Sequence, residues 1–417
     1  MGSSGELWFD VIVVGGGIMG SCTAYETSKR GYSTLLLEQF DLLHNRGSSH
    51  GESRTLRVTY PEHYYPSLVI ESSRLWDQAQ AEIGYRVLYP TTQLDIGPSD
   101  DLSLQAVLSS CLSNSVGCRI LDPLQLEQEF FGRVVIPEGW IGVVSEGAAV
   151  IKPTKAVAMF QALALRHGAV LRDNMQVTAM TRDNHDGGVS VSTATGEKFR
   201  GKKCVVTAGP WMKKLVEAVT PGRQIPIQPL ETTICYWRIK QEHKDDYTIK
   251  GGFPSFAGYG NPYIYGTPSL EYPGLIKIAV HAGRPCDPDC RTWTPRSDLM
   301  DLLRNWVIDR FGGRVEADGP VSTQSCSCMY SMTPDEDYVI DFLEGEFGKD
   351  VVIAGGFSGH GFKMGPVIGR IVADMALDGD VQGVELEYFK LARFVKNPKG
   401  NVKDFSEQVG IKAADST

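Results

Sequence analysis

The stretch FDVIVVGGGIMGSCTAYETSKRGYSTLLLEQF, residues 9–40, determines the fold class. It begins with the continuous apolar run 11–14, which is typical of a parallel strand buried on both faces. Segment 18–30 can form a helix, and Gly31 stands where a helix often ends in a left-handed residue. A second short strand is expected over 34–37. The stretch therefore predicts a βαβ unit.

Three glycines in the turn of this unit have the spacing G-x-G-x-x-G. Gly15 permits a tight turn, Gly17 lets the backbone approach a pyrophosphate, and Gly20 allows close packing of helix and strand. The helix N-terminus offers oriented N–H groups to phosphates, and Glu38 can accept hydrogen bonds from ribose hydroxyls. The pattern predicts a dinucleotide site and, with an acid at residue 38, disfavours NADP. The alternative is a glycine-rich turn in some other βαβ unit.

Two later segments repeat the order strand, small-residue turn and helix, at 202–216 and 350–379. Residues 67–84 and 152–166 have helical patterns. Between residues 226 and 290, short β-like runs alternate with Pro and Gly clusters, which indicates a mostly antiparallel sheet. We therefore expect one nucleotide-binding domain assembled from separated segments, with the intervening chain forming a second domain.

Composition narrows the class of partner. The chain has 417 residues, 42% hydrophobic and 22% charged, as in ordinary soluble globular proteins, and its length favours two structural units. The net charge of -9, without acidic blocks, argues against nucleic acid or an anionic membrane as the main partner.

No apolar run approaches the ~20 residues of a membrane span. The N-terminus lacks a signal-peptide pattern and the C-terminal ADST is not a standard peroxisomal address, so we expect an intracellular protein.

Nine scattered cysteines favour reduced thiols in an intracellular compartment. Cys286 and Cys290 could imitate a metal site, but no second ligand pair has zinc-site spacing, so we expect no metal. Cys326 and Cys328 lie two residues apart, just before Tyr330. A disulfide between them is disfavoured, because alternate side chains of a strand share a face but stand roughly 7 Å apart.

The last helix favours a flavin over NAD. If its N-terminus, near residues 359–363, points at the pyrimidine side of an isoalloxazine, its dipole and free N–H groups stabilise the negative charge that develops there on reduction. Three motifs then indicate a family: SSHGESRTLRVTY at 48–60, CMYSMTPDEDYVID at 328–341 and GFSGHGFKMGPVIGRI at 356–371. Together they resemble the monomeric sarcosine oxidase and pipecolate oxidase family, most closely its plant members, over nearly the whole chain.

The resemblance implies a two-domain α/β fold of the D-amino acid oxidase type, with a Rossmann-like FAD-binding domain and a mainly antiparallel substrate domain. It also implies oxidation of secondary or N-methyl amino acids, with O2 reduced to hydrogen peroxide. The cysteine carrying an 8α-thioether to FAD matches Cys328, and Cys326 remains a competitor because a Ser-Cys pair precedes the motif. The expected domains are 8–48, 148–220 and 320–390 for FAD, 49–147 and 221–319 for substrate, and 391–417 as a tail.

The resemblance also implies residue roles. A substrate carboxylate would bind Arg57 and Lys363, and Lys277 would activate oxygen. Arg54 would lie over the flavin. Only His50 matches the pair of adjacent histidines found in many members, because residue 49 is Ser, which puts a special role for the pair in doubt. The expected catalytic residues are Arg54, Arg57, Tyr265, Lys277, His281, Tyr330 and Lys363. The expected FAD-binding residues are Gly15, Gly17, Ile18, Met19, Gly20, Glu38, Gln39, Ser48, His50, Arg54, Val177, Cys328, Gly356, Gly359, His360, Gly361, Phe362 and Lys363.

Several functional alternatives stay open at this point. The same fold could serve pipecolate or a larger amine of specialised metabolism, could pass electrons to an acceptor other than O2, or could bind FAD without catalysis. Retention of the charged and aromatic residues named above argues against the last alternative. We expect a monomer in the peroxisome or cytoplasm, with an amino acid and O2 as its small-molecule partners.

Overall fold

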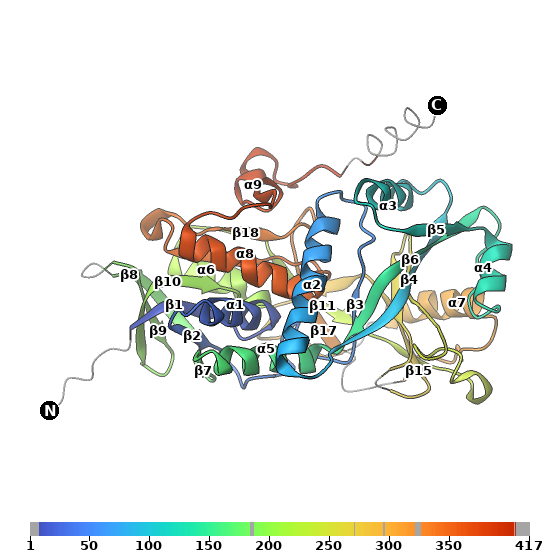
Figure 1. Ribbon diagram of the computed structural model, residues 1–417, viewed down its shortest axis with the longest axis horizontal. Helices are drawn as coiled ribbons and strands as arrows, with labels where there is room; N and C mark the ends of the chain where they lie inside the picture. The colour runs from blue at the N-terminus through green and yellow to red at the C-terminus, as the bar shows by residue number, and fades with distance from the viewer. Residues whose placement is uncertain are drawn as a thin grey trace.

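The computed structural model describes residues 8–183, 187–270, 272–294, 297–321, 327–403 and 405. Its helices and strands form an α/β structure with three sheets (Figure 1). The helices are α1 (Ile18–Lys29), α2 (Tyr65–Ile83), α3 (Leu102–Ser113), α4 (Pro123–Glu129), α5 (Pro153–Arg166), α6 (Met212–Val219), α7 (Met300–Phe311), α8 (Gly365–Asp378) and α9 (Ala392–Lys396).

The first sheet contains the predicted βαβ unit. Its strands β19, β10, β1, β2 and β7 are parallel in this order, and antiparallel strands extend it: β18 beside β19, and the hairpin β8–β9 beside β10. The strands are β1 (Trp8–Val14), β2 (Thr34–Leu37), β7 (Val170–Arg172), β8 (Val177–Arg182), β9 (Val189–Thr193), β10 (Lys198–Val206), β18 (Val339–Phe342) and β19 (Val351–Gly355). Strands from both predicted later repeats thus join the sheet of the first.

Both faces of this sheet are buried, as the apolar run at 11–14 predicted. Val11 and Val13 pack among α1, α5 and α8, whereas Ile12 and Val14 belong to the core on the opposite face with α6. Helices α1 and α8 lie side by side (Figure 1). Their close approach depends on glycine, because a Cβ on Gly369 would lie 2.7 Å from the Cβ of Cys22. This contact fixes the start of α8 beside the glycine-rich turn.

The second large sheet is mainly antiparallel, as predicted for residues 226–290, although β13 and β4 pair in parallel. Figure 1 shows its long strands β4 and β6 beside α3 and α4. The strands are β3 (Arg54–Leu56), β4 (Leu88–Pro98), β5 (Cys118–Leu121), β6 (Trp140–Ile151), β12 (Tyr236–Arg238), β13 (Ser255–Gly258), β14 (Ile264–Thr267) and β15 (Leu275–Val280). This sheet supplies one wall of the cavity described below.

The third sheet is a small antiparallel one, in the order β16 (Gly283–Pro285), β11 (Gln228–Thr233) and β17 (Ser327–Met332). The β-like run at 231–239 is therefore divided between two sheets, β11 in this one and β12 in the second. Strand β17 lies within 320–390, which was assigned to the FAD domain, and pairs with β11 from the stretch assigned to the substrate domain. The domain boundaries remain a prediction.

The final helix begins later than the sequence indicated. Residues Phe362–Met364 form a 3₁₀ turn, η5, and α8 starts at Gly365 with Pro366 in its first turn. Proline is favoured there because the first N–H groups of a helix have no intrahelical partner to lose. Lys363 therefore precedes the helix instead of starting it.

Candidate active site

One large cavity, of about 1370 Å³, runs from the glycine-rich turn after β1 to the inner ends of β14, β15 and β17. It is larger than the roughly 300–1,000 Å³ of ordinary small-molecule pockets. Most of the predicted site residues line it, although they come from segments far apart in the chain. The exceptions are Gly20 and Gly356. The cavity has room for a dinucleotide together with a small substrate.

The glycine-rich turn leaves no space for side chains. Gly15 has φ +103°, and a Cβ there would lie 2.6 Å from the carbonyl oxygen of Thr207. A Cβ on Gly20 would lie 1.8 Å from the carbonyl oxygen of Gly15, so this glycine packs against the turn and does not line the cavity. The turn therefore presents bare backbone at the start of α1, as phosphate binding requires.

Glu38 follows β2 at the same end of the cavity and is buried. Its Oε2 accepts a hydrogen bond from the backbone N–H of Gly16 at 2.7 Å, and its Oε1 accepts one from Phe40 at 3.0 Å. The sequence prediction missed His44, whose Nε2 lies 3.4 Å from Oε1 of Glu38. Two backbone donors thus hold the carboxylate in one orientation beside the glycine turn.

Cys328 lies on β17 with its side chain buried in the cavity wall. Nη2 of Arg54 lies 3.6 Å from its sulfur. Burial disfavours the thiolate, but the imidazole of His50 and the positive charge of Arg54 outweigh it and lower the pKa of the Cys328 thiol to about 6. A thiolate at neutral pH is nucleophilic. Cys326, the competing cysteine, lies outside the described residues.

Lys277 and Arg54 meet at one backbone carbonyl. The carbonyl oxygen of Ser53 accepts from Nζ of Lys277 at 3.1 Å and from Nη1 of Arg54 at 2.8 Å. Lys277 is 3% exposed, and burial together with the nearby charge of Arg54 lowers the pKa of its ammonium to about 7. The predicted strand lysine is therefore not a solvated edge charge.

Arg57 follows β3 and donates to two hydroxyls, that of Tyr263 at 3.1 Å and that of Thr59 at 3.3 Å. Its guanidinium lies 4.9 Å from the centre of the Tyr60 ring. Among the described residues, no carboxylate forms an ion pair with the Arg57 guanidinium within 4.0 Å. The buried Asp95 interacts with it electrostatically, but only from a greater distance. The planar fork is held by neutral partners.

Lys363 is 5% exposed. Its ammonium donates to the hydroxyl of Tyr60 at 2.6 Å and to the carbonyl oxygen of His360 at 2.8 Å. Burial, reinforced by the charge of Arg57, holds the pKa of Lys363 well below its usual range. Arg57 and Lys363 thus face the same part of the cavity without a carboxylate partner among the described residues, and an anion bound there would favour the charged form of Lys363.

Three further predicted residues line the same part of the cavity. The hydroxyls of Tyr265 and Tyr330 lie 3.1 Å apart, and the His281 and Tyr330 rings have centroids 5.1 Å apart. Burial and the cations Arg57 and Lys363 lower the pKa of His281, against the opposing effect of Glu336. His281 follows β15 directly and lines the cavity together with Lys277.

Sequence reasoning missed some of the contacts that orient these side chains. Tyr60 links Lys363 to Nδ1 of His360, and Tyr263 holds Arg57. Tyr60 ends the quoted motif at 48–60 and Tyr263 stands two residues before Tyr265, so proximity in sequence was the available signal. The strand contact that brings Thr207 against Gly15 had no such signal, because it joins residues 192 apart.

The residues fit FAD on grounds of shape and donor chemistry. The glycine turn would be filled by any Cβ, and the buried Ser48 Oγ and His50 Nε2 have no hydrogen-bond partner although both residues line the cavity. Gly359 completes the opposite wall, where a Cβ would lie 2.8 Å from the ring atoms of His281 and Tyr330. By contrast, the described residues contain no group of three or more His, Cys, Asp or Glu suited to a metal ion.

Comparison with known proteins identifies the family. Residues 10–375 match the model of the FAD dependent oxidoreductase family, DAO. The chain is 60% identical over 404 residues to a probable sarcosine oxidase of Arabidopsis thaliana, with 96% of each chain covered. The chain belongs to the sarcosine oxidase family of FAD-dependent oxidoreductases. A peroxisomal sarcosine oxidase of Homo sapiens is 34% identical and covers 94% of this chain and 98% of its own.

Solved structures agree on the fold of this sarcosine oxidase family member. NikD, described as an unusual amino acid oxidase essential for nikkomycin biosynthesis, has a TM-score of 0.78 at 24% identity, covering 91% of this chain and 96% of its own. An L-proline dehydrogenase from P.horikoshii has the same TM-score at 21% identity, covering 93% and 98%. The protein is a flavin-dependent amine oxidoreductase of the D-amino acid oxidase fold. No helix among its described residues is long and apolar enough to cross a membrane.

Proposed function

We propose that this protein is an oxidase of small N-methyl or other secondary amino acids, with sarcosine as the simplest substrate. The reaction breaks one N–H bond of the amine and one C–H bond of the carbon next to the nitrogen, which removes two electrons and two protons and gives an imine. O2 takes up these electrons and protons and becomes hydrogen peroxide. Bound FAD would supply the two-electron chemistry. The relatives named sarcosine oxidase and N-methyl-L-tryptophan oxidase support this reaction class.

The observation that carries the proposal is that the half-buried Arg57 and the buried Lys363 face the same part of the cavity. Their contacts among the described residues are to hydroxyls and a carbonyl, which leaves their charge for a ligand. An arginine fork matches a carboxylate in two hydrogen bonds, and the lysine adds a point charge. A substrate carboxylate bound there would be oriented at two points and desolvated, which favours a single reactive pose.

The surroundings of the amine also suit this reaction. Because the pKa of His281 is lowered by burial and by the two cations, its imidazole is neutral at pH 7 and adds no positive charge. Arg57 and Lys363 themselves disfavour a second cation nearby and so favour loss of the substrate ammonium proton. We assign Tyr265 and Tyr330 the role of hydrogen-bond partners for the amine or the carboxylate, since their hydroxyls lie within hydrogen-bond distance of each other in the cavity wall.

Lys277 is the proposed site of oxygen activation. A buried positive charge stabilises the developing anion when an electron reaches O2, and Lys277 is fixed by its hydrogen bond to Ser53. Its position on β15, apart from Lys363 before α8, separates the oxygen function from the carboxylate function. A buried lysine that can stabilise reduced oxygen favours an oxidase over a dehydrogenase.

We also propose that Cys328 carries FAD as an 8α-thioether. Formation of the link replaces the S–H bond and one C–H bond of the flavin methyl group by a C–S bond, and releases two protons and two electrons, which O2 takes up as hydrogen peroxide. The lowered pKa of the thiol and the cation Arg54 beside the sulfur support this role. We further propose a monomer that acts in the peroxisome, since the human and mouse relatives are named peroxisomal.

Anaerobic mixing tests the proposed reaction. Flavin-loaded protein is mixed with sarcosine, other N-methyl amino acids, L-pipecolate, L-proline and D-amino acids, and the loss of oxidised-flavin absorbance is followed. We expect N-methyl amino acids to bleach the flavin, and admitted air to restore it with one hydrogen peroxide per substrate. Absence of bleaching by every N-methyl amino acid would contradict the substrate class, and failure of air to restore the colour would contradict the oxidase assignment.

A further inference from the structure

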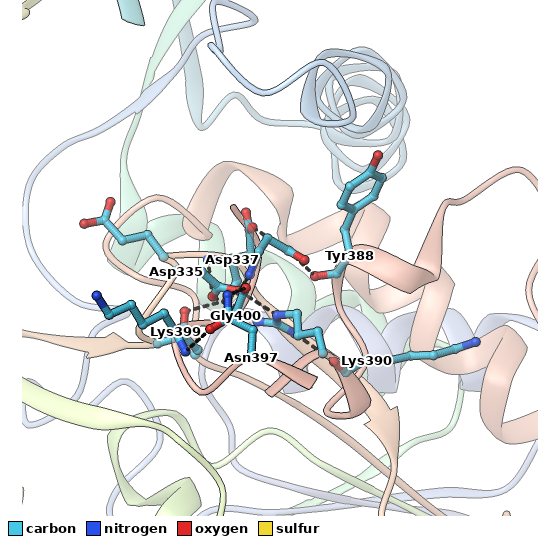
Figure 2. Close-up of polar contacts among 12 residues, drawn as sticks. Asp335, Asp337, Tyr388, Lys390, Asn397, Lys399 and Gly400 are labelled. Atoms are coloured by element: carbon cyan, nitrogen blue, oxygen red, sulfur yellow. Dashed lines mark hydrogen bonds and ion pairs between the residues drawn. The ribbon is translucent and has the colours of Figure 1, made fainter. Parts of the chain in front are cut away.

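Residues 393–403, which lie after α8, return to the cavity. Residues Arg393–Lys403, here called the C-terminal clamp, follow the start of α9, and Asn401 and Lys403 contribute to the cavity wall. Figure 2 shows the clamp residues Asn397 and Gly400 against Asp335 and Asp337, which belong to the turn after β17. The roles proposed above do not use this segment.

The first anchor of the clamp is Asp335. Its carboxylate receives two hydrogen bonds from the Arg393 guanidinium, at 2.7 and 3.2 Å, with both side chains almost fully buried. The backbone N–H of Asn401 donates to it at 2.8 Å. Burial opposes ionisation, but Arg393 and the N–H donors keep the pKa of Asp335 below its usual value. The clamp also fits sterically, since a Cβ on Gly400 would lie 2.0 Å from Oδ2 of Asp335.

The second anchor is Asp337, which is fully buried. Its carboxylate accepts from the Asn401 side-chain amide at 2.8 Å, and its backbone carbonyl accepts from Arg393 at 3.1 Å. Lys403 pairs with Glu62 at 2.7 Å and lies 3.5 Å from Asp337. The clamp therefore holds the residues on both sides of Glu336.

Glu336, between the two anchors, has the left-handed φ of +62°. A non-glycine residue keeps such a conformation only when its surroundings enforce it. Its carbonyl oxygen lies 2.9 Å from Nε2 of His360. A carbonyl can only accept, so Nε2 of His360 carries the proton and Nδ1 is the acceptor. The position of the Glu336 carbonyl thus fixes both the tautomer and the orientation of His360.

His360 in turn orients Lys363. Its Nδ1 lies within hydrogen-bond distance of two hydroxyls, that of Tyr338 at 2.9 Å and that of Tyr60 at 3.0 Å, and the Tyr60 oxygen accepts from Nζ of Lys363 at 2.6 Å. The carbonyl oxygen of His360 accepts a second hydrogen bond from the same ammonium at 2.8 Å. Both hydrogen bonds of the ammonium therefore depend on the placement of His360.

We propose that the C-terminal clamp is a positioning element for substrate binding: through Asp335, Asp337 and the Glu336 carbonyl it sets His360, and through His360 and Tyr60 it sets the ammonium of Lys363. The inference rests on the proposed function, because it takes Lys363 as a carboxylate ligand. It assigns Arg393, Gly400 and Asn401 to the binding of substrate, although none of them contacts Lys363.

The test uses two clamp variants and a carboxylate that cannot be oxidised as an amine. Methoxyacetate has an ether oxygen where sarcosine has nitrogen, and its binding is followed by the change in flavin absorbance. Gly400→Ala forces the clamp away from Asp335, and Asn401→Ala removes the amide donor to Asp337. We expect the dissociation constant of methoxyacetate and the KM of the amino acid to rise about tenfold in Gly400→Ala and about threefold in Asn401→Ala, with kcat within twofold. The control is Val395→Ala, since Val395 is 87% exposed in the same segment and should change neither constant.

A double-mutant cycle separates positioning from general damage. In a Lys363→Met background, Gly400→Ala should add no further loss of methoxyacetate affinity. The effects of two substitutions are not additive when both residues act through the same series of contacts. An additive loss, or an unchanged dissociation constant in flavin-loaded Gly400→Ala, would overturn the inference. If Gly400→Ala does not retain flavin, Asn401→Ala decides by the same criterion. If the unmodified protein neither binds methoxyacetate nor oxidises N-methyl amino acids, the proposed function fails first and the inference falls with it.

Discussion

The two ends of the cavity are built in different ways. The end beside β1 and β2 is built from one continuous stretch, in which the bare backbone of the turn at Gly15 and the carboxylate of Glu38 lie within 24 residues of sequence. The opposite end is made of side-chain charges from distant segments, such as Arg57, Lys277 and Cys328. A site for a common dinucleotide needs only a turn and a helix start, whereas the chemical end needs buried charges whose pKa values depend on one another. The comparison predicts that removing one charged side chain changes chemistry strongly at the second end, whereas removing the charge of Glu38 changes cofactor affinity modestly at the first.

The largest effect is expected at the covalent link. Cys328→Ser should abolish flavin that remains with the protein after denaturation, because a hydroxyl does not ionise near neutral pH. Denaturing gel electrophoresis with flavin fluorescence measures this directly. The matched variant Cys326→Ser should keep the fluorescent band. A reversal of the two results would move the link to Cys326.

The link should also form faster at higher pH. The pKa of the Cys328 thiol is about 6, so the thiolate predominates above pH 6 and is a minor species at pH 5. We expect covalent incorporation into FAD-reconstituted apoprotein to be roughly tenfold slower at pH 5 than at pH 7.5, measured from the same fluorescent band over time. Equal rates at both pH values would show that thiol ionisation does not limit the reaction.

Lys277→Met should slow reoxidation by O2 about 10²–10³-fold, the usual loss when one preorganised charge or donor is removed. Anaerobic reduction by substrate should change far less. Because the pKa of Lys277 is lowered to about 7, its ammonium is charged below that pH and neutral above it. The reoxidation rate of the unmodified protein should therefore fall as pH rises through about 7, and this step should vanish in the variant. Stopped-flow mixing of reduced protein with O2 measures both rates, and a Lys277→Met protein that reoxidises normally would remove the proposed oxygen site.

Arg57→Lys keeps the charge but loses the fork. We expect KM for the amino acid to rise roughly 10- to 100-fold, in line with about 1.5–3 kcal/mol for a charge-assisted hydrogen bond. Steady-state hydrogen peroxide production at varied substrate gives the constant. Arg238→Lys, at a more exposed arginine on β12, is the control. An equal KM in Arg57→Lys and the unmodified protein would place carboxylate binding elsewhere.

The smallest effect is expected at the nucleotide end. Glu38→Gln keeps the shape of the side chain and removes its charge, so the FAD dissociation constant should rise only about 5- to 10-fold, or about 1 kcal/mol. The measurement uses flavin fluorescence in a Cys328→Ser background, where FAD is exchangeable, with the exposed Glu242→Gln as control. A rise beyond a thousandfold would break the contrast between the two ends.

The same contrast explains which features the sequence predicted. The strand, glycine turn, helix and acid follow one another, so residue spacing alone was enough to predict the βαβ unit with Glu38 at the end of its second strand. The family resemblance predicted roles for Arg57, Lys277, Cys328 and Lys363, and the fold brings these residues to one cavity. Spacing could not show that Arg54 and Lys277 share the Ser53 carbonyl, or that β11 and β12 separate into two sheets. These features depend on contacts between elements that are distant in the chain.

The tail illustrates the same limit. The sequence predicts only a C-terminal tail over 391–417, yet Arg393 and Asn401 bind the turn whose Glu336 carbonyl contacts His360. A short segment with one arginine and two asparagines carries no signal in isolation. Its role becomes visible only beside the two buried aspartates.

The most direct test of the central claim changes the substrate and leaves the protein intact. Sarcosine and sarcosinamide have the same secondary amine, but the amide lacks the carboxylate charge. Anaerobic flavin reduction by both is compared at equal concentrations of free base. The account predicts that removal of the charge slows reduction at subsaturating concentration at least about 100-fold, because Arg57 and Lys363 are left without an anion. Equal rates for the two compounds would contradict the claim that Arg57 and Lys363 select an amino acid.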